Sequence, residues 1–371
     1  MRMSQPNFVC DLPADVITEI LCRLPIKTIV QCKCVCKNWQ SLLLDSEFAK
    51  LHLSRSPSSI IINHLHSSVP DDNDIFSIID LEHGYLCFDP VMKFDYTSIN
   101  TEVFLLGSSN GLLLLNSIYD DSLLICNPIM REYISLPRAE GVPRHFNRVA
   151  AYGFGYCSSN GMYKVVKIDQ EQSIDSETWA VTRCSVYSPG ERGWRSVECL
   201  GLWFASGSVG VQLADKLHWF IFDPKGRDLI CSFDLNRESF QPLPPPPTLS
   251  TNTVATLGVI RECLCLSNTT PDYVLELWVM KEYGAKESWT KELVINRPDY
   301  WLPYVLIYPI TVLRDGEILF LCSNHTLFSA HHEKKMIKVF DDDIFQNDFE
   351  AMVHVPSFLS LNNFEVEVKT F

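Results

Sequence analysis

A strand-rich unit recurs along most of the chain and limits the possible folds more than any other feature. Each copy has a glycine-containing turn, an apolar strand, a polar turn, a second strand that ends in Asn or Asp, and a short third strand. Clear copies cover 109–137, 214–244, 261–294 and 315–343, and a copy with an insertion runs from 158 to 197. The repeat length is roughly 45–60 residues, as in four-stranded propeller blades.

The repeat predicts a closed ring of blades. Six to eight blades fit the length of the chain from residue 75 to 371. Closure of such a ring requires the last strand to pair with the first blade, and a closed ring exposes few strand edges. The alternative is a large sandwich of two sheets, which matches the repeat length less well. The expected fold is therefore a small all-α module followed by a large all-β domain, a β-propeller.

Helical periodicity is confined to the beginning of the chain. Pro13 suits the first position of a helix and Pro25 ends that helix. Two further short helices are expected, one at about 27–35 and one through Trp39. A polar, proline-containing break follows. We therefore expect three helices within 8–54, a linker or first edge strand at 55–74, and the β-propeller at 75–371.

Charge and hydropathy exclude two kinds of partner. The formal net charge is −14, whereas the residues up to Arg55 hold seven basic and five acidic side chains. Because the chain has no basic stripe, nucleic acid is not an expected partner. The first residues have no apolar core of a secretory signal, and the longest apolar run, 301–313, contains two prolines and is too short to span a bilayer. We expect no membrane partner, a location in the cytoplasm or nucleus, and reduced cysteines.

Known catalytic and metal-binding patterns are missing from the sequence. Cys32, Cys34 and Cys36 stand at i, i+2 and i+4, so on a helix the three thiols cannot converge on one ion. The sequence has no serine-hydrolase elbow, phosphate-binding loop or zinc-protease motif. It also lacks the His and Tyr cluster of a copper oxidase propeller and the repeated Asp-boxes of a sialidase. We therefore expect no cofactor and no catalysis, and a carbohydrate-active or glycan-binding propeller is the weaker alternative.

The first forty residues carry a recognisable pattern. Leu12-Pro13, Arg23-Leu24-Pro25 and Val35-Cys36-Lys37 with Trp39 follow one another at the separations of an F-box, which this segment resembles. The resemblance implies binding to the Skp1 adaptor. A module of this size can bury little of its own apolar surface. We expect Val16, Leu42 and Leu43 to be mainly structural, and we expect the adaptor to contact Leu12, Pro13, Ile20, Leu21, Leu24, Pro25, Ile26, Val30, Val35 and Trp39.

Phrases after the F-box resemble the F-box-associated, kelch-like domain of plant F-box proteins. They include GSSNGLLLL, ICNPIMREYISLP and FDLNRESFQPLP, and they are spread from about 107 to 292. The resemblance implies a substrate receptor of an SCF ubiquitin ligase, joined through Skp1 to cullin and RING subunits. A second reading is an interaction protein that binds Skp1 without delivering anything for ubiquitination. The target, which in similar proteins includes immune receptors and pollen-recognition ribonucleases, stays open, as does a small-molecule co-ligand.

Two loops stand out as candidate target-binding segments, because propellers bind partners through loops at one end of the ring. The first is locally basic within an acidic domain, and the second combines aromatic side chains with arginine, residue types that are frequent in binding hot spots. An alternative is that the aromatic residues fill gaps between blades. The candidate residues are Arg144, His145 and Arg148 in the first loop, and Arg297, Tyr300, Trp301 and Tyr304 in the second.

Overall fold

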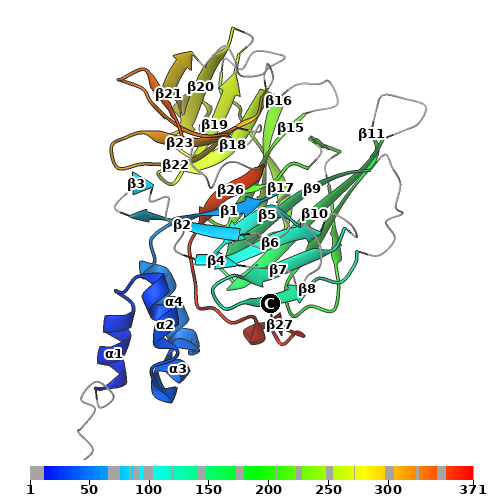
Figure 1. The fold of residues 1–371 in the computed structure, drawn as a ribbon. Helices are drawn as coiled ribbons and strands as arrows, with labels where there is room; N and C mark the ends of the chain where they lie inside the picture. Colours follow the sequence, from blue (N-terminus) through cyan, green and yellow to red (C-terminus); the bar gives the residue numbers. More distant parts are fainter. Residues whose placement is uncertain are drawn as a thin grey trace, which may run out of the picture.

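The structure is a computed structural model of the chain. It describes residues 12–65, 76–82, 85–86, 92–94, 103–117, 121–139, 148–172, 179–199, 201–205, 207–222, 228–247, 254–270, 272–296, 305–322, 326–340 and 348–370. Within these residues, four short helices precede six antiparallel sheets (Figure 1).

The helical module has one helix more than the sequence predicted. Its helices are α1 (Ala14–Leu21), α2 (Ile26–Cys32), α3 (Lys37–Leu43) and α4 (Ser46–Arg55). Pro13 and Pro25 occupy the N-cap positions of α1 and α2. The missed helix α4 has little apolar periodicity, since it buries only Phe48, Ala49 and His52. Its start could have been found, because Asp45 Oδ1 accepts a hydrogen bond from the Glu47 amide at 2.8 Å.

Six sheets of four or five strands form the β domain, which fits the lower end of the expected blade number. The first blade is built from both ends of the chain: β1 (Ser59–His64), β2 (Phe76–Glu82), β3 (Tyr85–Leu86), β4 (Met92–Phe94) and the late strand β26 (Phe349–His354). The second contains β5 (Val103–Ser109), β6 (Leu112–Ser117), β7 (Leu123–Asn127), β8 (Glu132–Ser135) and the terminal β27 (Lys369–Thr370).

The other four blades are continuous in sequence. Blade 3 has β9 (Arg148–Cys157), β10 (Met162–Gln172), β11 (Trp179–Tyr187) and β12 (Arg195–Val197). Blade 4 has β13 (Trp203–Phe204), β14 (Val211–Leu213), β15 (Lys216–Phe222), β16 (Asp228–Asp234) and β17 (Ser239–Leu243). Blade 5 has β18 (Val254–Ile260), β19 (Cys263–Thr269), β20 (Val274–Met280) and β21 (Trp289–Asn296). Blade 6 has β22 (Ile307–Val312), β23 (Ile318–Cys322), β24 (Thr326–His331) and β25 (Met336–Val339).

Innermost strands of successive blades contact one another around the ring, in the order β26, β5, β9, β14, β18, β22 and back to β26. Glycines permit this close approach. A side chain at Gly258 would meet Pro309 of the next blade at 2.6 Å, and a side chain at Gly153 or Gly210 would meet Trp219 at 2.5 Å. The arrangement is a six-bladed β-propeller, as the repeat predicted, and not a sandwich.

The ring closes through β26, which pairs with β1 from Ser59 opposite His354 to His64 opposite Phe349. A late strand thus closes the ring on the first blade, but it is not the last one as we expected, because the terminal strand β27 joins blade 2. The pairing with β26 also places β1 between β26 and β2. Part of the segment 55–74, which we expected to be a linker or first edge strand, is therefore a central strand of a blade.

A buried polar contact fixes the register at this closure. Glu350 Oε2 of β26 accepts hydrogen bonds from the Leu105 amide of β5 at 2.7 Å and from Asn63 Nδ2 of β1 at 2.9 Å. Asn63 Nδ2 also donates to the Val103 carbonyl at 2.7 Å. One carboxylate therefore joins the first strand, the closing strand and the second blade.

Replacing Glu350 tests the importance of this contact. Glu350→Ala leaves the Leu105 amide without its acceptor and removes one of the two acceptors of Asn63 Nδ2, so we expect the free energy of unfolding to fall by about 2–4 kcal/mol. The control is Glu47→Ala, whose carboxylate pairs with exposed Lys50 at 2.7 Å and whose loss should change stability by less than about 1 kcal/mol. Urea unfolding followed by tryptophan fluorescence measures both. Equal, small losses would show that the closure does not depend on Glu350.

Candidate functional site

The outer face of the helical module carries an unusual concentration of exposed apolar side chains. Of the twelve large apolar side chains that are exposed among the described residues, five lie on this module, although it is the smaller part of the chain. They are Leu12, Val16, Ile20, Val35 and Leu44, with exposed fractions of 39–57%. Pro13 and Pro25 are exposed as well. So many exposed apolar side chains on so small a module are typical of a surface that binds another protein; we call them the outer patch.

The inner face of the module is buried. Leu21, Ile29 and Leu43 have no exposed surface, and Ile26 is 7% exposed. They belong to one apolar cluster, the junction cluster, which also contains Ile61 of blade 1 and many residues of blade 2. The helices therefore cover one side of the propeller's own core.

The ten residues expected to contact an adaptor thus divide into three groups. Leu12, Pro13, Ile20, Pro25 and Val35 are exposed. Leu24, Val30 and Trp39 are half-buried against the junction cluster, and Leu21 and Ile26 lie inside it. Val16, which we expected to be structural, is 43% exposed and extends the outer patch, whereas Leu43 is fully buried as expected.

A segment after the closing strand, residues 355–368, holds the module to the ring; we name it the strap. In Figure 1 it runs from β26 past the helices to β27. Ser56 Oγ, just after α4, donates to the Pro356 carbonyl at 3.1 Å. The ring of Phe358 packs edge-on against Phe48 and His52, with centroid distances of 5.7 and 5.0 Å. The strap therefore completes the inner face of the module.

Blade 2 fixes the other side of the strap. Asn127 Nδ2 donates to the carbonyls of Ser357 at 3.0 Å and Leu359 at 2.7 Å. Glu132 accepts from the Leu361 amide at 2.7 Å, and β27 then pairs with β8. Sequence reasoning missed this segment because it has no periodicity of either kind.

An ion pair joins the first and last helices of the module, α1 and α4. Arg55 of α4 makes two hydrogen bonds of 2.9 Å to the two carboxylate oxygens of Glu19 in α1. The hydrogen bond from Arg55 lowers the pKa of Glu19 below its ordinary value. Because both side chains are exposed, the pair orients α1 more than it stabilises the module.

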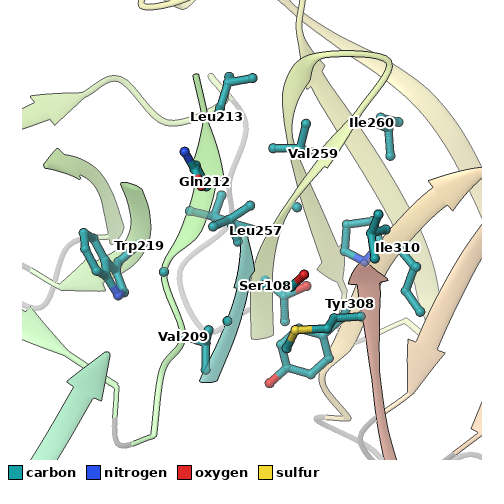
Figure 2. A pocket seen from close by; sticks show the side chains of 18 of the residues that line it. Ser108, Val209, Gln212, Leu213, Trp219, Leu257, Val259, Ile260, Tyr308 and Ile310 are labelled. Carbon is teal, nitrogen blue, oxygen red and sulfur yellow. The ribbon is translucent and has the colours of Figure 1, made fainter. Parts of the chain in front are cut away.

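The second candidate site is a cavity of about 1630 Å³ along the axis of the ring. Its lining includes Val209, Val211 and Leu213 of blade 4, Leu257 and Val259 of blade 5, and Tyr308 and Ile310 of blade 6. In Figure 2 the labelled side chains of blade 4 lie across the cavity from those of blades 5 and 6, with Tyr308 and Val209 toward one end and Leu213 and Val259 toward the other.

The residues predicted for target binding cannot be placed. Arg144, His145, Arg297, Tyr300, Trp301 and Tyr304 lie outside the described residues, and of Arg148 only the backbone, at the start of β9, is described. Within the part of the chain that is described, no three His, Cys, Asp or Glu side chains gather where they could hold a metal ion. None of the helices described there is long and apolar enough to cross a bilayer.

Comparison with known families decides the identity of both parts. Residues 9–51 match the F-box domain, and residues 68–361 match the F-box associated beta propeller domain. The chain belongs to the F-box proteins with an associated β-propeller. The helical module is thus the F-box and the ring is the associated domain, as the sequence resemblance implied.

Relatives agree with this assignment. The F-box/kelch-repeat protein At3g23880 of Arabidopsis thaliana is 30% identical over 342 residues, which are 85% of this chain and 88% of that protein. The F-box protein CPR1 of the same plant is 29% identical over 348 residues, 85% of this chain and 80% of its own length. Among solved structures, the six-bladed lectin of Aleuria aurantia has a TM-score of 0.41 at 11% identity, over 77% of this chain and 95% of the lectin. Nothing about function follows from so distant a likeness.

His52 makes the contact between the F-box and the strap sensitive to acid. Burial lowers the pKa of His52 to about 4, so the folded protein stays neutral there while the unfolded chain takes up a proton below about pH 6.5. Stability is therefore lost as the pH falls from 6.5 towards 4. Between pH 7.5 and 6.0 this histidine should account for about 0.8 kcal/mol of lost stability.

The matched variant is His52→Phe, which keeps an aromatic ring between Phe48 and Phe358. Its stability should fall by about 0.8 kcal/mol less than that of the wild type between pH 7.5 and 6.0, as measured by urea unfolding. His218 and His354, whose pKa values burial also lowers, act equally in both proteins and cancel. Identical pH dependence in variant and wild type would contradict the assignment.

Proposed function

We propose that the protein is the substrate-recognition subunit of an SCF ubiquitin ligase. Its F-box binds a Skp1-type adaptor, and through it cullin and RING subunits, while the propeller holds a target protein for ubiquitination and degradation. The observation that carries the proposal is the exposed apolar patch on the F-box. The F-box cannot bury this patch itself, because its inner face is already occupied by the junction cluster.

The patch has the composition of an interface core. Its exposed members are aliphatic, and the half-buried Trp39 lies on the same module. A few apolar and aromatic anchors supply most of the affinity in such interfaces. We infer that the adaptor contacts Leu12, Pro13, Ile20, Pro25 and Val35 directly. On the same reasoning Leu21 and Ile26 support the contact from inside the module.

Strand directions support a division of labour between the two ends of the ring. The F-box joins β1 at Ser59, opposite the last residue of β26. Contacts of Glu350 with Leu105 and of His354 with Ser108 show that β5 runs parallel to β26. The Tyr152–Val209 bridge is likewise parallel. Innermost strands therefore begin at the end of the ring far from the F-box. Arg148, the last candidate residue of the first predicted loop, begins β9 at that end, and Ile307, which follows the second predicted loop in the chain, begins β22 there.

An interaction protein that binds Skp1 without delivering a substrate remains the alternative. The two functions predict the same adaptor complex, so adaptor binding alone does not separate them. Reconstituted ubiquitin transfer to a co-purified partner separates them directly. Transfer that depends on the F-box supports the receptor function, and a partner that stays unmodified in an active reconstituted ligase supports the alternative.

Ile20→Asp tests the adaptor-binding face. A charge in the centre of an apolar interface should weaken adaptor binding by at least about 30-fold, the loss expected at a hot spot. The matched control is Met336→Asp on the outer strand β25, because Met336 and Ile20 are both 45% exposed. Titration calorimetry with purified adaptor measures the affinity, and circular dichroism checks folding. Unchanged affinity of a folded Ile20→Asp protein would overturn the proposed interface.

Two substitutions in the second predicted loop test target binding. Trp301→Ala and Tyr300→Ala should reduce target capture while adaptor binding stays normal, because Ile307, which follows this loop in the chain, begins β22 at the end of the ring far from the F-box. Affinity purification with the proteasome inhibited, on a background lacking the F-box, identifies the partners whose recovery is compared. Loss of solubility in both variants would instead indicate that these aromatic side chains fill gaps between blades.

A further inference from the structure

The axial cavity is built as a preformed binding site and not as an incidental gap between blades. All six blades contribute to its lining, including Leu105 of blade 2, Tyr156 of blade 3 and Met352 of blade 1. At about 1630 Å³ it exceeds the usual volume of a small-molecule pocket. A ligand of ordinary size therefore fits without displacing any strand.

The cavity is apolar on several sides along its length. Val209, Val211 and Leu213 are only half-buried, and they line the cavity from blade 4. Half-buried Val259 lies on blade 5 and half-buried Met352 on blade 1. Aliphatic surface left uncovered inside a rigid ring is surface that an apolar ligand would remove from water.

The walls are held rigidly. Gln212 Oε1 accepts from Ser109 Oγ at 2.7 Å, and its Nε2 donates to the Tyr156 carbonyl at 2.7 Å, so one side chain ties β14 to blades 2 and 3. Asp215 accepts from the Ser158 amide at 2.8 Å and from Ser159 Oγ at 2.5 Å. Burial would raise the pKa of Asp215, but these hydrogen bonds outweigh it and lower the pKa to about 2. The cavity is thus formed before anything binds.

Polar groups toward one end of the cavity can orient a ligand. Tyr308 is 39% exposed, it lines the cavity (Figure 2), and its hydroxyl makes no hydrogen bond within the described residues. The buried hydroxyl of Ser208, which also lines the cavity, has no partner there either. Tyr308 is therefore a free donor for a carbonyl or ether oxygen.

Charge narrows the class of ligand. Glu350 lines the cavity near Tyr308. Burial raises the pKa of the Tyr308 phenol, and the negative charge of Glu350 raises it further. The cavity mouth near the F-box has both signs of charge, with Asp215, Lys216, Arg261 and Glu262. An anionic ligand is disfavoured next to a carboxylate in a chain of net charge −14.

We propose that the axial cavity binds an uncharged, mostly apolar small molecule that places a hydrogen-bond acceptor against the hydroxyl of Tyr308. This site is separate from the adaptor face. Its occupancy does not require the ligase function.

Nile red is a suitable probe, because it is neutral, carries a carbonyl acceptor and fluoresces in apolar surroundings. Fluorescence titration of the full chain should show saturable binding of one dye per protein. Val211→Trp and Val259→Trp fill the cavity from neighbouring blades and should each reduce affinity at least tenfold. Tyr308→Phe, which conserves shape, should reduce it about 3- to 10-fold through the lost hydrogen bond.

Two controls separate the cavity from exposed apolar surface. Val339→Trp, at a 39% exposed position on the outer strand β25, and Ile20→Asp, on the F-box patch, should leave dye affinity unchanged. Ile20→Asp also keeps this test independent of the proposed function, since it removes adaptor binding only. Absence of saturable binding, normal affinity in Tyr308→Phe and in the folded cavity-filling variants, or loss of binding in Ile20→Asp would each overturn the proposal.

Discussion

The pairing of β26 with β1 is the constraint on which the rest of the structure depends. A ring of blades closes only if a late strand returns to its first blade. That return brings His354 opposite Ser59, so the chain leaves the F-box and leaves the ring at the same place. The strap therefore reaches the F-box at its start, where the Pro356 carbonyl accepts a hydrogen bond from Ser56 at the end of α4. The pairing that closes the propeller therefore also brings the strap beside the F-box.

The F-box has two apolar faces, and the size of the module explains why. Four helices of seven to ten residues cannot enclose a core of their own. The inner face solves this problem within the chain, because blade 1, blade 2 and Phe358 complete the junction cluster. The outer face has no such cover among the described residues. A partner protein is the remaining way to remove Ile20 and Val35 from water.

Periodicity in the sequence predicted the elements better than it predicted their surroundings. The strand repeat indicated the propeller because each blade repeats the same turn and strand chemistry. The spacing of Val16, Ile20, Leu21 and Leu24 indicated a helix, but it could not tell which apolar residues face the ring. Leu21 became core and Val16 became surface because the ring's side of the helix is set by the strap and by blade 2, both distant in sequence. The axial cavity depends on the same long-range packing, so no local sequence motif predicts it.

Two attachments make the F-box a fixed extension of the ring. One connection through β1 alone would leave the module free to rotate about Ser56–Ser58. The strap adds a second connection, since Asn127 and Glu132 hold it to blade 2 while Phe358 enters the junction cluster. The proposed adaptor face therefore has one orientation relative to the far end of the ring. In the ligase that we propose, the distance from adaptor to target would be set by the height of the propeller and not by a flexible linker.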